Sequence, residues 1–177
     1  MSFAERIRQH DENAYPLVRD ALARYGFTLH RFGIELNLEL QKILQKQTDK
    51  TSKMLRYRPD FIAVCPGKKS ILLEIKSENK NSPNFSIEYD AWEAAKIWNK
   101  HTKNILYLFV DLAENNILAS WPENLDPEII FTYRHEDEIR LSSLNIKTKR
   151  LFTVSGSGTA FFLVSKKKLF SLDELFS

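Results

Sequence analysis

The spacing of apolar residues predicts a helix near the N-terminus. Apolar residues between positions 14 and 25 recur at intervals of three and four, and Gly26 stands where the C-terminal cap of a helix belongs. Pro16 fits only the first turn of that helix, or a break from an earlier helix over residues 3 to 11. The position at which this helix begins is therefore open.

The next segments predict a strand, a helix and a loop. Residues 27 to 32 alternate well enough for a short strand, and residues 36 to 47 return to helical spacing. The polar stretch from residue 45 to residue 53 predicts a mobile loop.

Two apolar runs in the middle of the chain predict a hairpin. They cover residues 60 to 65 and 70 to 76, and the connection between them contains Pro66, Gly67 and Lys68, which suit a turn. A hairpin centred on Gly67 pairs residues that lie at equal distances from it in the sequence.

The hairpin is followed by the pattern of a helical crossover. Residues 81 to 84 read as a loop, and Ser86 is placed to cap a helix over residues 87 to 100. Residues 105 to 110 are apolar throughout, as in a strand that is covered on both faces and reached by a helix.

The order of these elements is helix, three strands, helix, strand, which predicts an α/β domain with a mixed sheet flanked by helices. We expect one domain over residues 1 to 177, with a core over about 12 to 110 and a C-terminal extension over about 111 to 177. That extension adds three strands and a short terminal helix, predicted over residues 129 to 134, 150 to 154, 160 to 165 and 171 to 176.

Composition indicates a folded, cytoplasmic protein. Hydrophobic residues make up 43% of the chain and charged residues 28%, which is unlike a disordered or fibrous sequence. No apolar run approaches the roughly 18 residues that a membrane span needs, and the polar N-terminus does not resemble a signal peptide. We therefore expect no membrane partner, and a location in the cytoplasm of a bacterial, archaeal or phage-infected cell.

The net charge of +3 is modest, but the charges are segregated along the chain. Residues 42 to 58 carry six basic side chains and one acid, and residues 140 to 172 carry seven basic side chains and no acid, whereas residues 111 to 138 hold eight acids and one base. Such segregation fits a face that binds a polyanion, and it fits ordinary solvated loops equally well.

The predicted hairpin brings two carboxyl groups and one amine together. Asp60 and Glu74 are each seven residues from Gly67, so they oppose one another, and Glu74 and Lys76 share one face of their strand. Opposed residues have Cβ atoms roughly 4.5 to 5.5 Å apart, close enough for both carboxylates to bind one cation. Two carboxylates at this distance otherwise repel each other, so a hard divalent cation is expected between them.

These residues also carry a family resemblance. Arg58, Pro59, Asp60 and Phe61, followed by the run from Leu73 to Lys76, resemble the signature of the PD-(D/E)XK nuclease superfamily. The element order is similar to the common core of that superfamily, and the resemblance covers roughly residues 12 to 110. It implies a restriction-endonuclease-like fold and a metal-dependent DNA endonuclease, similar either to Holliday junction resolvases or to transposon and phage endonucleases.

The resemblance also implies roles for individual residues. Asp60, Glu74 and the main-chain carbonyl of Ile75 would hold Mg²⁺, for which Mn²⁺ can substitute, and Lys76 would orient or deprotonate the attacking water. Many members supply a glutamate from the first helix, and Glu12 is the best candidate, although Pro16 leaves open whether it lies inside that helix. Others add a polar residue from the later helix, for which three positions are available and none is chosen: Glu88, Tyr89 and Lys96.

The basic segments are expected to hold the DNA backbone in a sequence-independent way. A homodimer formed through the apolar C-terminal strands is open, as are roles in DNA recombination or repair. The alternative function is a nucleic-acid-binding module that has the same fold and no catalysis. The basic residues expected to contact DNA are Lys53, Arg56, Arg58, Lys147, Lys149, Arg150, Lys166, Lys167 and Lys168.

Overall fold

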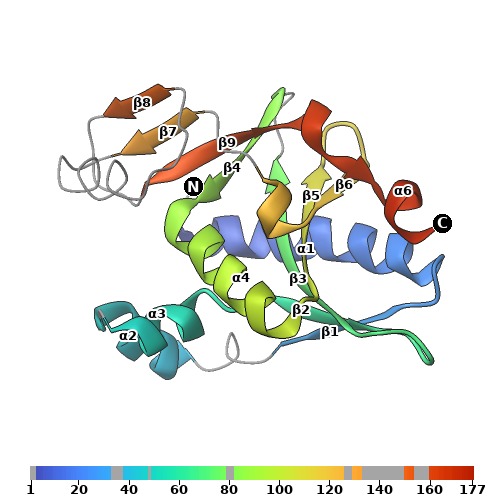
Figure 1. The fold of residues 1–177 in the computed structure, drawn as a ribbon, viewed down its shortest axis with the longest axis horizontal. Helices are drawn as coiled ribbons and strands as arrows, with labels where there is room; N and C mark the ends of the chain where they lie inside the picture. Colours follow the sequence, from blue (N-terminus) through green and yellow to red (C-terminus); the bar gives the residue numbers. More distant parts are fainter. Residues whose placement is uncertain are drawn as a thin grey trace.

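The computed structural model describes residues 3 to 32, 38 to 47, 49 to 78, 82 to 125, 129 to 132, 150 to 153 and 160 to 177. Two sheets carry the fold, and helices cover both faces of the larger one (Figure 1).

The larger sheet has six strands in the order β1-β2-β3-β5-β6-β10. All neighbours are antiparallel except β3 and β5, which are parallel and are joined through α4 (Tyr89–Thr102), the crossover predicted from the sequence. The strands are β1 (Thr28–Arg31), β2 (Phe61–Val64), β3 (Ile71–Glu78), β5 (Ile105–Asp111), β6 (Asn116–Ser120) and β10 (Phe170–Ser171).

The smaller sheet has the order β4-β9-β7-β8 and contains all three of the predicted C-terminal strands. Its β4 follows β3 in the chain and pairs with β9, which lies more than seventy residues later (Figure 1). Its strands are β4 (Asn84–Glu88), β7 (Ile129–Thr132), β8 (Arg150–Thr153) and β9 (Phe161–Ser165). The ends of two predicted strands, residues 133 to 134 and 154, lie outside the described residues.

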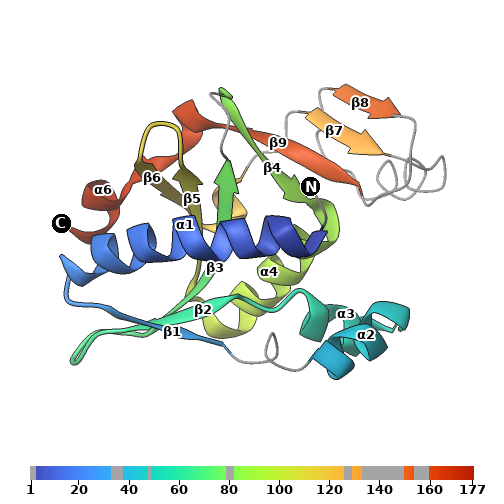
Figure 2. The same cartoon turned by 180° about the vertical axis from the view of Figure 1, so that it is seen from behind.

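Helix α1 (Phe3–Ala23) lies across one face of the larger sheet (Figure 2). Its buried stripe of Ala14, Val18 and Leu22 packs on side chains that include Leu73 and Ile75 of β3, because alternate residues of a strand face the same side. Glu74 and Lys76 consequently face the opposite side.

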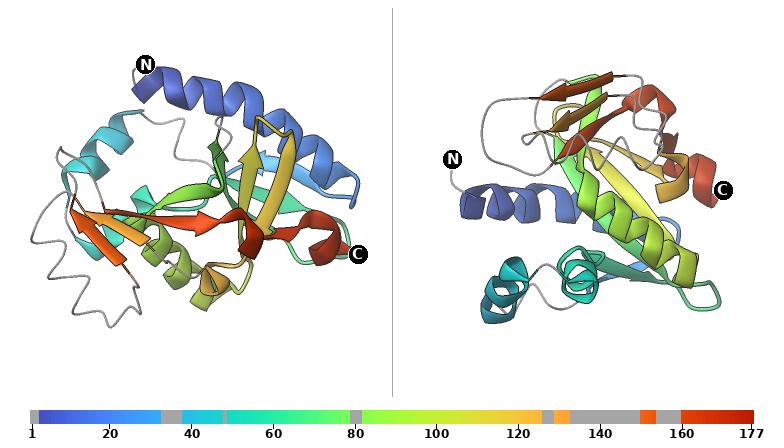
Figure 3. Two further views of the ribbon diagram at one scale, coloured as in Figure 1. Left: turned by 90° about the horizontal axis from the view of Figure 1, so that it is seen from above. Right: turned by 60° about the vertical axis from the view of Figure 1, so that its left-hand side comes forward.

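On that opposite side, α4 and the smaller sheet share a second core with the larger sheet (Figure 3). Leu72, Tyr107 and Phe109 of the larger sheet pack there with Trp92 of α4 and Phe162 of β9. Glu74 and Lys76 therefore lie on the side of the sheet that faces α4 and the C-terminal part of the chain.

Two short helices stand between β1 and β2, where a loop over residues 45 to 53 was predicted. They are α2 (Leu38–Lys46), which confirms the helix predicted over residues 36 to 47, and α3 (Lys50–Arg56), which shows that the prediction of a loop was wrong. The Asp49 carboxylate caps α3 by accepting from the Ser52 amide at 2.9 Å. The α2–α3 unit is attached to α4, because the Trp98 indole donates to the main-chain carbonyl of Met54 at 3.4 Å.

Two further boundaries differ from the prediction. Helix α1 is continuous through Pro16, so Glu12 lies within it, and the proline leaves the Glu12 carbonyl without its usual donor. Ser86 is a residue of β4 and does not cap a helix, since α4 begins two residues later than predicted, with Glu88 at its N-cap position.

The remaining short elements complete the C-terminal region. The predicted terminal helix is confirmed as α6, and Ser171 and Glu174 form its capping box. These elements are η2 (Pro122–Asn124), η3 (Lys166–Lys168) and α6 (Leu172–Phe176).

Candidate active site

The predicted hairpin register is confirmed. Phe61 pairs with Leu73 and Ala63 with Ile71, an arrangement symmetric about Gly67, which adopts a positive φ of 78° in the turn. The same register places Asp60 across from Glu74, one step beyond the last paired residues of β2.

Asp60 stands at the point where β2 leaves β3. The ladder stops at Phe61, and the Asp60 carboxylate then accepts a hydrogen bond from the main-chain amide of Ile75 at 3.1 Å. This hydrogen bond gives the Ile75 amide an acceptor where β2 no longer pairs with β3. It also holds the Asp60 carboxylate beside Glu74.

Glu74 and Lys76 form an ion pair on the same face of β3. Their Oε1 and Nζ atoms are 2.7 Å apart, and the side chains are only 11% and 27% exposed. Burial makes this pair unlike a solvated surface pair, because each charge has lost much of its water and depends on its partner.

The carboxyl groups strongly affect one another. Burial, and then the charge of Asp60, raise the pKa of Glu74 from its usual 4.5 to about 7, although Lys76 acts in the opposite direction. Burial lowers the pKa of Lys76, but the charges of Glu74 and Asp60 outweigh it and raise that pKa above its ordinary value. At neutral pH the negative charge of the carboxyl groups at this site is thus larger than the positive charge of its single lysine.

A divalent cation fits this donor set. Within the described residues there is no group of three His, Cys, Asp or Glu side chains placed to hold a metal ion, so two carboxylates would be its main protein ligands. Mg²⁺ commonly binds in this way, through one or two carboxylates, with water and substrate phosphate completing its shell. The oxygen donors and the raised pKa of Glu74 both favour such an ion.

Two further residues lie beside this site: Glu88, one of the three positions left open on the later helix, and Tyr107, which the sequence did not single out. Glu88, at the junction of β4 and α4, contributes negative charge that raises the pKa values of Glu74 and Lys76. Tyr107 lies next to Glu74 in the parallel β3–β5 ladder, and its buried hydroxyl has no hydrogen-bond partner within the described part of the chain. The only signal for Tyr107 was one hydroxyl within an otherwise apolar strand.

Glu12 lies on α1 with an exposed side chain. The charges that shift the pKa of Glu74 come from Asp60, Lys76 and Glu88. The buried stripe of α1 packs on the sheet face opposite to Glu74. Glu12 is therefore not among the charged residues that the structure places around Glu74.

The basic residues next to Asp60 make local contacts. The Arg56 guanidinium donates to the Tyr57 hydroxyl at 3.1 Å, and that of Arg58 donates to the Leu55 carbonyl at 3.2 Å. Lys53, on the same helix, is partly buried. These contacts place three positive charges on the chain segment that leads into Asp60.

Lys166 differs from its two neighbours. Its ammonium forms an ion pair with Asp111, and the two side chains are only 16% and 1% exposed, whereas Lys167 and Lys168 are exposed. Lys166 is therefore committed to holding η3 on the end of β5. Lys147 and Lys149 lie outside the described residues, and only the backbone of Arg150, the first residue of β8, is described.

Comparisons with known proteins give a fold relationship and no sequence relationship. No protein-family model matches the chain, and no curated protein sequence matches it. Among solved structures, the chain is similar to D212, a nuclease from a fusellovirus, with a TM-score of 0.50 and 10% identity over 94% of this chain and 88% of that one. It is also similar to Hjc, a Holliday junction resolvase from Archaeoglobus fulgidus, with a TM-score of 0.49 and 10% identity over 92% of this chain and 99% of that one.

The likeness to D212 confirms the predicted fold class. The chain has a restriction-endonuclease-like α/β fold, with a mixed sheet flanked by helices. Among the described helices, none is both long enough and apolar enough to span a bilayer.

The raised pKa of Glu74 predicts that the metal-free protein loses stability as pH rises. The folded state holds the Glu74 proton up to about pH 7, whereas the unfolded chain releases it near 4.5, so the loss develops between these values and reaches about 3 kcal/mol at most. Urea unfolding at pH 5 and pH 8 in EDTA measures this change. Glu74→Gln cannot ionise and should lack this decline, and an equal decline in both proteins would contradict the assignment.

Proposed function

We propose that this protein is a metal-dependent DNA endonuclease that hydrolyses phosphodiester bonds, with Asp60, Glu74 and Lys76 as its catalytic residues. The observation that carries the proposal is the pair of opposed carboxyl groups where β2 leaves β3, joined by a buried lysine ion pair. The fold shared with D212, itself a nuclease, supports it.

In this proposal Asp60, Glu74 and the main-chain carbonyl of Ile75 hold Mg²⁺, or Mn²⁺ in its place. A bound divalent ion of this kind stabilises charge on the phosphate and acidifies water. Glu12 is kept as a candidate further ligand, supplied by α1.

Lys76 acts on the attacking water as a cation. Without a bound cation, the neighbouring carboxylates raise the pKa of Lys76, so its amine carries a positive charge at neutral pH. We assign it to orienting the attacking water and stabilising developing negative charge.

The DNA backbone would lie over the α2–α3 unit and the chain leading into Asp60. The exposed lysines Lys42, Lys46 and Lys50 and the partly buried Lys53 belong to this unit, which stands directly before the site in the chain. Lys167 and Lys168 offer a second basic patch on η3, and Lys166 is left out because of its pairing with Asp111. A homodimer, a cytoplasmic location and a preference for branched DNA belong to the same proposal.

The rival function is a DNA-binding module without catalysis. Burying charged carboxylates beside a lysine lowers the stability of the fold, and binding DNA alone does not require buried carboxylates at this position. This cost favours the enzyme.

Incubation with supercoiled plasmid separates the two functions. We expect nicks with Mg²⁺ and none with EDTA, and a panel of linear duplex, flap, four-way junction and single-stranded DNA then identifies the preferred substrate. DNA binding with no nicking under Mg²⁺ or Mn²⁺ would favour the binding module.

The proposed DNA surface predicts a change in salt dependence. Replacing Lys46, Lys50 and Lys53 together with alanine should weaken binding about equally for all sequences and lower the slope of log K against log salt by up to about 0.9 for each lost phosphate contact. Fluorescence anisotropy at several salt concentrations measures this slope.

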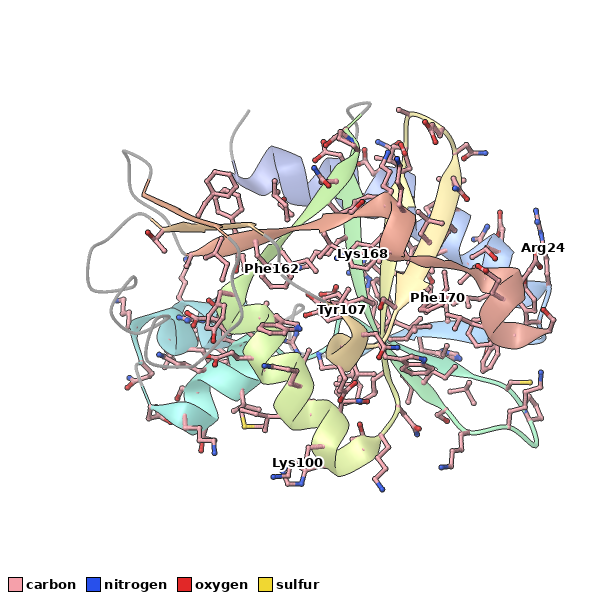
Figure 4. All side chains as sticks on the ribbon, turned by 45° about the horizontal axis from the view of Figure 1, so that its top comes forward. Arg24, Lys100, Tyr107, Phe162, Lys168 and Phe170 are labelled. Atoms are coloured by element: carbon pink, nitrogen blue, oxygen red, sulfur yellow. The ribbon has the colours of Figure 1, made fainter. Side chains whose placement is uncertain are left out.

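A matched control carries the same change in charge at lysines outside the proposed DNA surface. Lys68 and Lys69 lie at the tip of the β2–β3 hairpin, and Lys100 lies near the C-terminal end of α4 (Figures 1 and 4). Replacing these three with alanine should leave the slope close to that of the unchanged protein. Equal effects from both sets would mean that only net charge matters.

A further inference from the structure

The hydroxyl of Tyr107 is not explained by packing. The residue lies on β5 in the centre of the molecule (Figure 4), is 0% exposed, and stacks on Phe109 with ring centroids 5.9 Å apart. Its hydroxyl oxygen is buried and finds no hydrogen-bond partner among the residues that the structure describes. A phenylalanine would fill the same space without the cost of an unsatisfied polar group, so the hydroxyl needs another reason.

Tyr107 stands beside the proposed metal ligands. It is the direct neighbour of Glu74 in the parallel ladder between β3 and β5, and both side chains are on the sheet face that packs against α4. After burial, the largest influences that raise the pKa of Tyr107 are the charges of Glu74 and Asp60. The phenol is therefore within electrostatic reach of both carboxyl groups.

Glu74 has a use for a second donor. Its Oε1 atom accepts from Lys76, and burial makes its charged form costly. A charged buried carboxylate is stabilised by each hydrogen bond it accepts, and a tyrosine hydroxyl is a suitable neutral donor. The Tyr107 hydroxyl, on the neighbouring strand β5, is such a donor.

We propose that Tyr107 is a positioning residue of this site: when the divalent cation is bound, its hydroxyl donates a hydrogen bond, directly or through one water, to the Glu74 carboxylate and fixes it as a ligand. This inference rests on the proposed function. Ligand carboxylates in metal sites are commonly held by such contacts, and their loss typically weakens metal affinity about tenfold to a hundredfold.

Tyr107→Phe tests the inference because it removes one oxygen atom and keeps the ring. We expect kcat to fall about tenfold or more and the Mg²⁺ concentration at half-maximal rate to rise. The KM for DNA should not change, since the buried phenol is out of reach of DNA. Stability without metal should be equal or higher, because an unsatisfied hydroxyl is gone, while the increase in Tm on adding Mg²⁺ or Mn²⁺ should shrink.

Tyr25→Phe is the matched control. Its hydroxyl bonds to Asp173 near the C-terminus, and its removal should leave kcat and the metal-induced increase in Tm unchanged. Cleavage and metal dependence in Tyr107→Phe equal to those of the unchanged protein would overturn the inference. A loss of metal-free stability would also contradict it, by showing that the hydroxyl is used within the fold.

The two proposals fail in different ways. If the unchanged protein binds metal but cuts no DNA, the endonuclease proposal fails, and the Tyr107 inference is decided by the metal-induced change in Tm alone. If Mg²⁺ and Mn²⁺ produce neither cleavage nor an increase in Tm, both proposals fail. If the unchanged protein cuts DNA, and Tyr107→Phe cuts it with the same rate and the same dependence on metal, only the Tyr107 inference is overturned.

Discussion

Lys76→Ala is expected to lower the rate of DNA cleavage by about a hundredfold or more, while DNA binding and metal uptake persist. The substitution keeps Asp60 and Glu74 as ligands and removes the cation that orients the attacking water, and such a group typically contributes about a hundredfold or more. Single-turnover cleavage with saturating Mg²⁺ measures the rate, and Ca²⁺-supported DNA binding by anisotropy measures the retained function.

Two variants of the same strand region serve as controls for Lys76→Ala. Lys69→Ala removes an exposed lysine just before β3, and Glu78→Ala removes the acid of the next Glu-x-Lys sequence. Both should cut DNA at close to the normal rate. Cleavage retained in Lys76→Ala but lost in Glu78→Ala would mean that the wrong Glu-x-Lys was chosen.

Asp60→Asn is expected to abolish cleavage by weakening metal binding, with little change in the fold. Asparagine keeps an oxygen that can accept from the Ile75 amide, so the contact that joins the start of β2 to β3 survives. The lost charge removes a metal ligand worth several kcal/mol of charge stabilisation, and about 3 kcal/mol alone corresponds to more than a hundredfold in rate.

The same variant has a second consequence that is independent of activity. Because the charge of Asp60 raises the pKa of Glu74, its loss should bring that pKa back toward the usual 4.5 and reduce the pH dependence of metal-free stability. Isothermal titration with Mn²⁺ and urea unfolding at two pH values test both effects. Full metal affinity in Asp60→Asn would remove Asp60 from the ligand set.

The hairpin and the crossover were predictable from the sequence because each depends on local chemistry. A turn at Gly67 fixes the register, and a register fixes which side chains share a face, so the opposition of Asp60 and Glu74 followed from counting. The uniformly apolar strand β5 likewise required cover on both faces and a parallel neighbour.

Other features depended on contacts between distant residues. The polar sequence of α3 is typical of a loop. It forms a helix that Asp49 caps and whose Met54 carbonyl accepts a hydrogen bond from the Trp98 indole of α4. Strand β4 exists because β9, far along the chain, supplies its partner. The pairing of Lys166 with Asp111 is equally nonlocal, and a run of three lysines gives no sign of which one is buried.

Glu12 and Tyr107 show the limit for the site itself. Glu12 is found by matching a superfamily pattern, and its exposed position on α1 leaves its role a prediction. Tyr107 sits within an apolar run that reads only as core, and its relation to Glu74 depends on the pairing of β3 with β5. Sequence periodicity identifies the faces of a strand, but not which strand is the neighbour.

The most direct test is the rate at which supercoiled plasmid is nicked in Mg²⁺ by the unchanged protein and by Asp60→Asn, purified in the same way and compared side by side. Nicking by the unchanged protein, abolished by EDTA and reduced at least about a hundredfold in Asp60→Asn, is the predicted result. Equal nicking by both proteins, or none by either in Mg²⁺ and Mn²⁺, would contradict the assignment of this site as a metal-dependent nuclease centre.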